Sequence, residues 1–172
     1  ASARAAGGWG PGPSGRPAFE DGARYSAQWN GAPATVWDYA DADGSDDVGT
    51  RSRFSAWDHE AGEDAVYVAW HTNAPSPARG TSSFAYGPSS YGPLSEFSGV
   101  PGSLQLMDAI HKELVADLRA AWDPAWQDRA QHTAYFGEVN PNHNPEMPAT
   151  LLEIAFHDTA ADADALREPA FR

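Results

Sequence analysis

The fold of this chain is constrained most by two apolar segments, DAVYVAWHTNA at 64–74 and PATLLEIAFHDT at 148–159. Each segment is rich enough in apolar residues for a buried strand, and each carries one reactive side chain, His71 or Glu153. A strand inside a sheet holds such a side chain in place without the need to order a loop. One imidazole and one carboxylate on two such strands are groups that a metal-dependent hydrolase needs.

Composition excludes several classes of function. The chain has 172 residues, enough for one domain with its own core. Its net charge of −13 repels phosphate backbones and anionic lipids, so we expect no nucleic-acid partner. No stretch approaches 18 consecutive apolar residues, so we expect no membrane insertion. Because the chain has no cysteine, a bound transition metal must be held by His, Asp or Glu.

The N-terminal third gives weaker signals. Residues 1–23 are rich in Gly, Pro and small residues, which predicts a linker or extended arm. Residues 24–37 hold enough aromatic and β-branched residues for one or two short strands around an Asn30-Gly31 turn. The acidic stretch 38–47 is expected to be a solvated loop, and 49–62 a helix that Gly62 ends.

The segment 64–70 is predicted to be a central strand, because both of its faces are apolar. Its residues alternate between the two faces. One face would carry Ala65, Tyr67, Ala69 and His71, and the other Val66, Val68 and Trp70.

The remaining segments alternate between strand and helix. A strand is expected at 82–87, followed by the strongest helix of the chain, which Ser103 would cap and which Pro124 ends. Two strands at 133–139 and 150–156 and a short helix at about 160–168 complete the order. This order predicts an α/β architecture.

Several segments together resemble a known family, the zinc-dependent N-acetylmuramoyl-L-alanine amidases that cut peptidoglycan. The resemblance covers roughly residues 49–172, and it depends on the joint order and spacing of its parts. NPNHNPE and IAFHDT indicate a divergent branch of that family. The matching parts are Arg53 to Ala56, AVYVAWHTNA (65–74), ARGTSSFAYG (78–87), the helix at 103–122 and PATLLEIAFHDTAADADALREPAFR (148–172).

The resemblance implies that 24–172 is part of an amidase-like catalytic domain. The implied fold is a mixed, mostly parallel twisted sheet flanked by helices, incomplete at the N-terminal side and lacking the last helix. Family members hold Zn²⁺ with two histidines and a glutamate, of which only the strand-end histidine has a counterpart here, His71. Residues 1–48 contain no histidine. We therefore expect a missing N-terminal part of the same protein to supply the other two ligands.

Two roles follow for the strand residues, each with a structural alternative. By the resemblance His71 is a zinc ligand; the alternative is a core histidine whose ring is satisfied by the backbone. Glu153 lies in an apolar strand, where an unpaired carboxylate costs several kcal/mol, so its presence needs a reason. The family's reason is general acid/base catalysis, and the alternative is a salt bridge to Arg119 or Arg129.

Two further residues are candidates for substrate binding. Asn73 would position substrate or stabilise the turn at the strand end. His143, in the loop before the Glu153 strand, would reach the cleft or lie on the surface. The resemblance implies peptidoglycan or a muropeptide as partner and a periplasmic or extracellular location. The alternative function is a non-catalytic cell-wall-binding or structural module that kept the fold without the full metal site.

Overall fold

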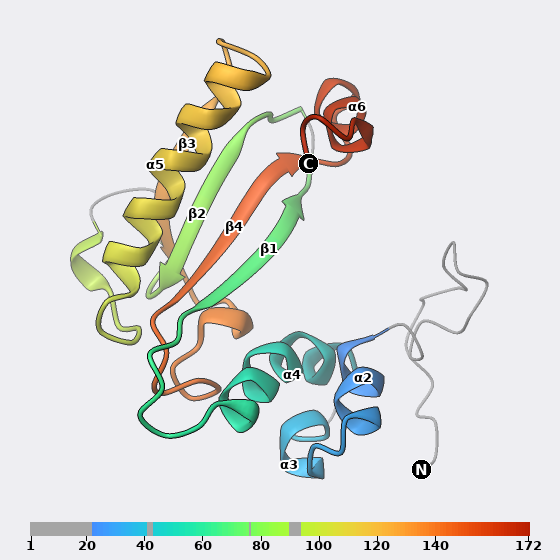
Figure 1. Cartoon of the computed structure of the whole chain (residues 1–172), viewed down its shortest axis with the longest axis vertical. Helices are drawn as coiled ribbons and strands as arrows, with labels where there is room; N and C mark the ends of the chain where they lie inside the picture. Colours follow the sequence, from blue (N-terminus) through green and yellow to red (C-terminus); the bar gives the residue numbers. More distant parts are fainter. Residues whose placement is uncertain (1–21, 41–42, 76, 90–93) are drawn as a thin grey trace.

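A computed structural model describes residues 22–40, 43–75, 77–89 and 94–172. Four strands form one sheet in the order β1-β4-β2-β3 (Figure 1). β1 pairs with β4 and β2 with β3 in parallel, while β2 and β4 are antiparallel. The predicted α/β class with a mixed, mostly parallel sheet is confirmed. The strands are β1 (Tyr67–Asn73), β2 (Thr81–Tyr86), β3 (Asp128–Ala134) and β4 (Ala149–Phe156).

Helices lie on both sides of this sheet. The long helix α5 (Ser103–Ala121) and the short α6 (Ala160–Arg167) pack with the strands through the apolar cluster around Leu152 and Trp126. A short 3₁₀ helix, η2 (Gly137–Val139), contributes Val139 to a second cluster that includes Leu151 of β4. Consecutive residues of β4 therefore enter different clusters, as the two faces of a buried strand require.

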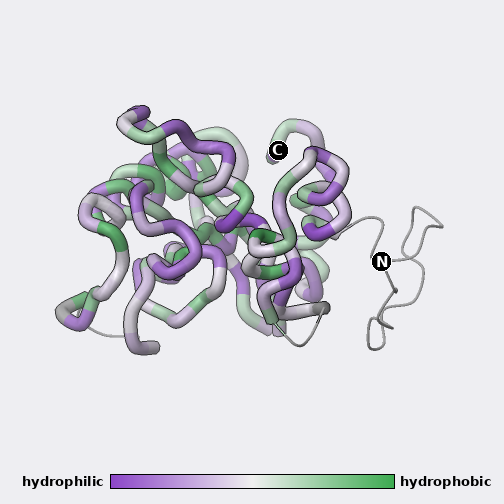
Figure 2. The backbone as a smooth tube through the Cα atoms, turned by 90° about the horizontal axis from the view of Figure 1, so that it is seen from below, coloured by the Kyte–Doolittle hydropathy of each residue, from purple (hydrophilic) through white to green (hydrophobic). Residues whose placement is uncertain are grey.

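Three helices at the start of the described chain form a layer of their own beside the sheet (Figure 1). They are α2 (Ala23–Trp29), α3 (Ala34–Trp37) and α4 (Asp43–Asp58). Ala27, Ala32 and Val36 make a small core there, and Phe54 of α4 packs against it. Figure 2 shows hydrophilic stretches recurring around the periphery of the molecule, in keeping with the acidic composition.

The strands predicted at 24–37 are wrong, since this segment forms α2 and α3. Its apolar residues are too few to distinguish a short strand from a short helix, and packing against α4 decides the matter. The predicted turn is present: Gly31 has φ +84°, a conformation that glycine adopts at little cost.

The loop predicted at 38–47 is also wrong in its second half, because α4 already begins at Asp43. Asp46 is fully buried, and its Oδ1 accepts hydrogen bonds from the backbone N–H groups of Tyr39 and Ala40. Carboxylates near a helix N-terminus are favourable, so the acidic stretch starts a helix. The helix expected at 49–62 is accordingly displaced toward the N-terminus.

The central strand predicted at 64–70 is corrected to β1, which spans Tyr67–Asn73 and lies at one end of the described sheet. Val66, Val68 and Trp70 are 56%, 37% and 57% exposed. An apolar pattern shows that a strand packs, but it does not show on which side a neighbouring strand lies.

Two other boundaries shift, and three elements are confirmed. The strand expected at 133–139 is β3, seven residues that end at Ala134, and the 3₁₀ helix η2 follows. Gly102, with φ +93°, occupies the N-cap position given to Ser103, whose hydroxyl instead accepts a hydrogen bond from the N–H of Ala149. The predictions at 82–87, 150–156 and 160–168 are confirmed as β2, β4 and α6.

The arm predicted at 1–23 lies outside the described residues, except that Gly22 precedes α2 and Ala23 begins it. Among the described helices, none combines the length and the apolarity needed to cross a bilayer.

Asp162 of α6 ties the ends of three segments together. Its side chain is fully buried. It accepts hydrogen bonds from Arg79 Nε at 2.7 Å and from the backbone N–H groups of Gly80 and Phe156 at 3.0 and 3.1 Å. Gly80 has φ +96°, and a Cβ there would lie 2.1 Å from the Gln127 carbonyl oxygen. Asp162 therefore fixes α6 over the end of β4.

We expect Asp162→Ala to lower the free energy of unfolding by about 2–4 kcal/mol, because it leaves two buried N–H groups and a guanidinium unpaired. Urea unfolding measures the change. The control is Asp164→Asn on the same helix, which removes only an exposed pair with Arg167 and should cost about 0–0.5 kcal/mol. Equal costs for the two variants would contradict this role of Asp162.

Candidate active site

The register of β1 and β4 brings His71 and Glu153 together. The two strands are parallel, and these two residues are register partners. Side chains of register partners leave a sheet on the same face. Two residues earlier in the same register, Ala69 and Leu151 share one buried cluster, which confirms that this face is common to both strands. The imidazole and the carboxyl group therefore lie side by side within two adjacent strands.

Glu138 of η2 is a third member of this site, and no sequence motif pointed to it. Its residue exposure is 4%. Its Oε1 lies 3.1 Å from His71 Nε2 and accepts a 2.9 Å hydrogen bond from Arg51 Nη1 of α4. The only sequence signal was a charged residue inside the apolar segment 133–139. Glu138, Arg51 and His71 thus form a connected charge network across three elements.

The environments shift the pKa values of the two carboxyl groups in opposite directions. Burial raises the pKa of Glu138, but its hydrogen bond with His71 and the charge of Arg51 outweigh burial, so the pKa is lowered overall. The pKa of Glu153 is raised, chiefly by burial and also by the negative charge of Glu138. The hydrogen bond to Glu138 raises the pKa of His71. Of the two carboxyl groups, Glu138 is therefore the stronger acid and Glu153 the weaker.

Glu153 has no salt bridge to either arginine that the structural alternative proposed. Arg119 donates from Nε to the Trp126 carbonyl oxygen, and the Arg129 guanidinium lies over the Phe156 ring at 5.2 Å. Oε2 of Glu153 is buried and has no hydrogen-bond partner within the described part of the chain. A buried oxygen of this kind is expensive unless it carries a proton or meets a ligand.

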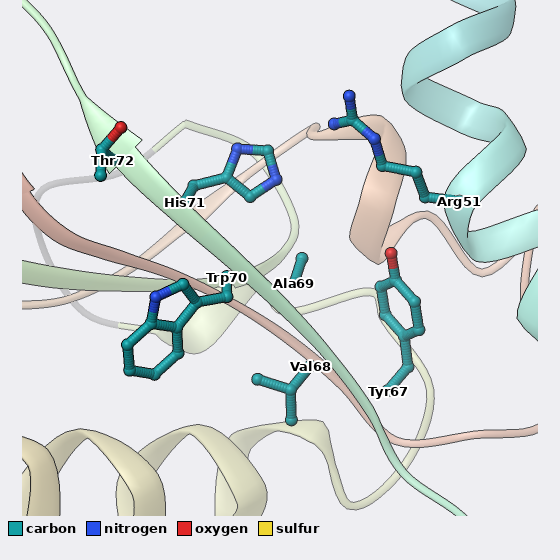
Figure 3. Close-up of a pocket in the computed structure, with 7 residues that line it drawn as sticks. All are labelled: Arg51, Tyr67, Val68, Ala69, Trp70, His71 and Thr72. Atoms are coloured by element: carbon teal, nitrogen blue, oxygen red, sulfur yellow. The ribbon is translucent and has the colours of Figure 1, made fainter. Parts of the chain in front are cut away.

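An open cavity of about 490 Å³ runs along β1 (Figure 3). Tyr67 and His71 point into it toward Arg51, whereas Val68 and Trp70 leave the opposite face of the strand. Burial raises the pKa of Tyr67 to about 12, so its hydroxyl stays protonated. The described lining is completed by Ala69 and Thr72.

Asn73 and His143 lie outside this lining. The Asn73 side chain accepts a 2.7 Å hydrogen bond from the N–H of Ala74, and the Asn73 carbonyl accepts one from the N–H of His157. His143 donates from Nδ1 to the Gly137 carbonyl at 2.8 Å, and burial lowers its pKa. The structure therefore places Asn73 at the last position of β1 and His143 against η2.

The described residues fit part of a zinc site. Zinc takes three or four protein ligands from His, Cys, Asp and Glu. In the described ranges no group of three or more such side chains is placed to hold a metal ion. His71 offers one imidazole, and the unpartnered oxygen of Glu153 lies beside it. This donor set fits one ligand position with an acid/base group next to it.

The raised pKa of Glu153 predicts a pH dependence of stability. A carboxyl group whose folded pKa exceeds its unfolded value stabilises the fold below the unfolded pKa, and that contribution is lost as pH rises through the folded pKa. The amide of Glu153→Gln does not ionise, so the variant does not lose stability in this way as pH rises. We expect the variant to gain stability relative to the native chain as pH rises above the ordinary pKa of a glutamate, about 4. Urea unfolding over this range measures it, and a difference independent of pH would contradict the prediction.

No protein-family model and no curated protein matches this chain in sequence. Solved amidase structures do resemble it. The N-acetylmuramoyl-L-alanine amidase from Clostridium difficile 630 has a TM-score of 0.55 at 18% identity, over 72% of this chain and 56% of that one. The catalytic domain of CwlV, from Bacillus (Paenibacillus) polymyxa var. colistinus, has a TM-score of 0.48 at 16% identity, over 95% of this chain and 81% of that one. The Clostridioides difficile CwlD amidase, solved in complex with the GerS lipoprotein, has a TM-score of 0.49 at 12% identity, over 75% of this chain and 55% of that one.

The chain spans little more than half the length of the Clostridium difficile 630 amidase. At 18% identity the likeness is one of fold, and it agrees with the resemblance expected from the strand and helix motifs. The chain has the fold of the N-acetylmuramoyl-L-alanine amidases.

Proposed function

We propose that this chain is part of the catalytic domain of a zinc-dependent N-acetylmuramoyl-L-alanine amidase. Its substrate would be the amide between N-acetylmuramic acid and L-alanine in peptidoglycan. The observation that supports this most is the pairing of His71 with Glu153 on one face of a sheet with the amidase fold. Two adjacent paired strands hold a nitrogen ligand and a carboxyl group rigidly, as hydrolysis requires.

Glu153 is the general acid/base in this proposal. Its raised pKa keeps it able both to take a proton from the attacking water and to deliver one to the leaving amine. His71 is one ligand of the metal. Zinc, when bound, polarises a carbonyl oxygen and lowers the pKa of water. The other ligands would come from elsewhere in the same protein.

Asn73 and His143 are proposed to contact the substrate. Both lie near the site without lining the described cavity: Asn73 follows His71 on β1, and His143 binds the residue before Glu138. A peptidoglycan substrate implies a periplasmic or extracellular location.

The test uses the complete protein with purified muropeptides. Glu153→Gln should reduce turnover by about 10²–10⁴-fold with zinc content unchanged, because it removes the proton-transfer group and no metal ligand. His71→Ala should lose both turnover and zinc. Glu60→Gln is the control: it alters an exposed carboxylate outside the site and should leave turnover unchanged.

Two outcomes would overturn the proposal. One is full activity of Glu153→Gln. The other is binding of cell wall by the complete, zinc-loaded protein with no turnover at all, which would favour the non-catalytic wall-binding module.

A further inference from the structure

The carboxylate of Glu138 is held from several directions. The carbonyl oxygen of the preceding residue, Gly137, accepts hydrogen bonds from His143 Nδ1 at 2.8 Å and from Ser52 Oγ at 3.3 Å. Arg51 then binds Oε1 of Glu138 at 2.9 Å. A carboxylate fixed at both its backbone and its oxygen is suited to orienting another group.

We propose that Glu138 is a positioning residue for His71. The Glu138 carboxylate accepts the hydrogen bond from Nε2–H of the imidazole, so Nδ1 is the ring nitrogen with a free lone pair. The 3.1 Å separation of Nε2 from Oε1 is a hydrogen-bond distance. Oε1 also accepts a hydrogen bond from Arg51 Nη1, so this oxygen is an acceptor and Nε2 must carry the proton. In a neutral imidazole the other nitrogen is then unprotonated.

This arrangement matches what a metal-binding histidine needs. Such a histidine donates its second ring N–H to a carboxylate or carbonyl group, which fixes the tautomer and the ring orientation. The link to a metal rests on the proposed function; the tautomer of His71 does not. Glu138 would thereby assign Nδ1, rather than Nε2, as the ligating atom.

A purely structural reading gives Glu138 only the task of joining α4 to η2 through Arg51. The two readings differ in what each partner does. If the ion pair alone mattered, loss of Arg51 and loss of Glu138 would have equal effects on His71. If Glu138 positions His71, only loss of Glu138 changes the imidazole, because the Glu138 oxygen stays beside Nε2 when Arg51 is replaced.

The first experiment reads the tautomer of His71 by ¹⁵N NMR of the imidazole in the chain as it stands, at a pH where the ring is neutral. In the native chain Nε2 should be protonated and Nδ1 unprotonated. Glu138→Leu should give a mixture of tautomers. Glu138→Gln should keep the native tautomer, because its amide oxygen still accepts, and Arg51→Gln should keep it as well.

The tautomer result decides the proposal irrespective of amidase activity. A native chain with Nδ1 protonated overturns it without any variant. It is also overturned if Glu138→Leu leaves the His71 signals unchanged, or if Arg51→Gln and Glu138→Leu alter them equally. Near-UV circular dichroism checks that each variant is folded.

The second experiment measures zinc affinity of the complete protein by competition with a chelator. Glu138→Leu should weaken binding by about 10–100-fold, and Arg51→Gln by much less. If His71 keeps one tautomer but the protein does not bind zinc, the proposed function is contradicted and the positioning role of Glu138 still holds. Equal zinc affinity of Glu138→Leu and the native protein would overturn the ligand assignment of Nδ1.

Discussion

The parallel pairing of β1 with β4 is the constraint on which the site depends. Because His71 and Glu153 are register partners, an imidazole and a carboxyl group project from the same face of the sheet. A register shift of one residue would send one of them to the opposite face. Pairing of Ala69 with Leu151 on the same face, both buried, holds this register through packing.

Around that pair, charge is distributed unequally between two carboxyl groups. Glu138 has a cationic partner and a lowered pKa, while Glu153 is half-buried, forms no ion pair with any residue that the structure describes, and has a raised pKa. Environments that push two neighbouring pKa values apart assign different tasks to chemically similar groups. Glu138 is accordingly suited to holding His71, and Glu153 to exchanging protons.

Residue types alone do not make a catalytic centre, as a second polar cluster illustrates. His111 Nδ1 lies 2.7 Å from Ser83 Oγ, and its Nε2 lies 2.9 Å from Asp128 Oδ1. These are the side chains of a hydrolytic triad, yet Ser83 is fully buried and His111 is 2% exposed. No substrate reaches that hydroxyl, so the cluster ties α5 to β2 and β3. Exposure and an adjacent cavity distinguish the His71 site from it.

Local patterns in the sequence predicted β2, β4, α5 and α6, most firmly α5, whose 19 residues carry an apolar stripe at helical spacing that a strand would not produce. They also marked His71 and Glu153 as polar residues on apolar strands. Tertiary structure alone decided that β1 lies at the end of the sheet, and that Glu138 meets His71. Both depend on contacts between segments far apart in the chain, which no local pattern encodes.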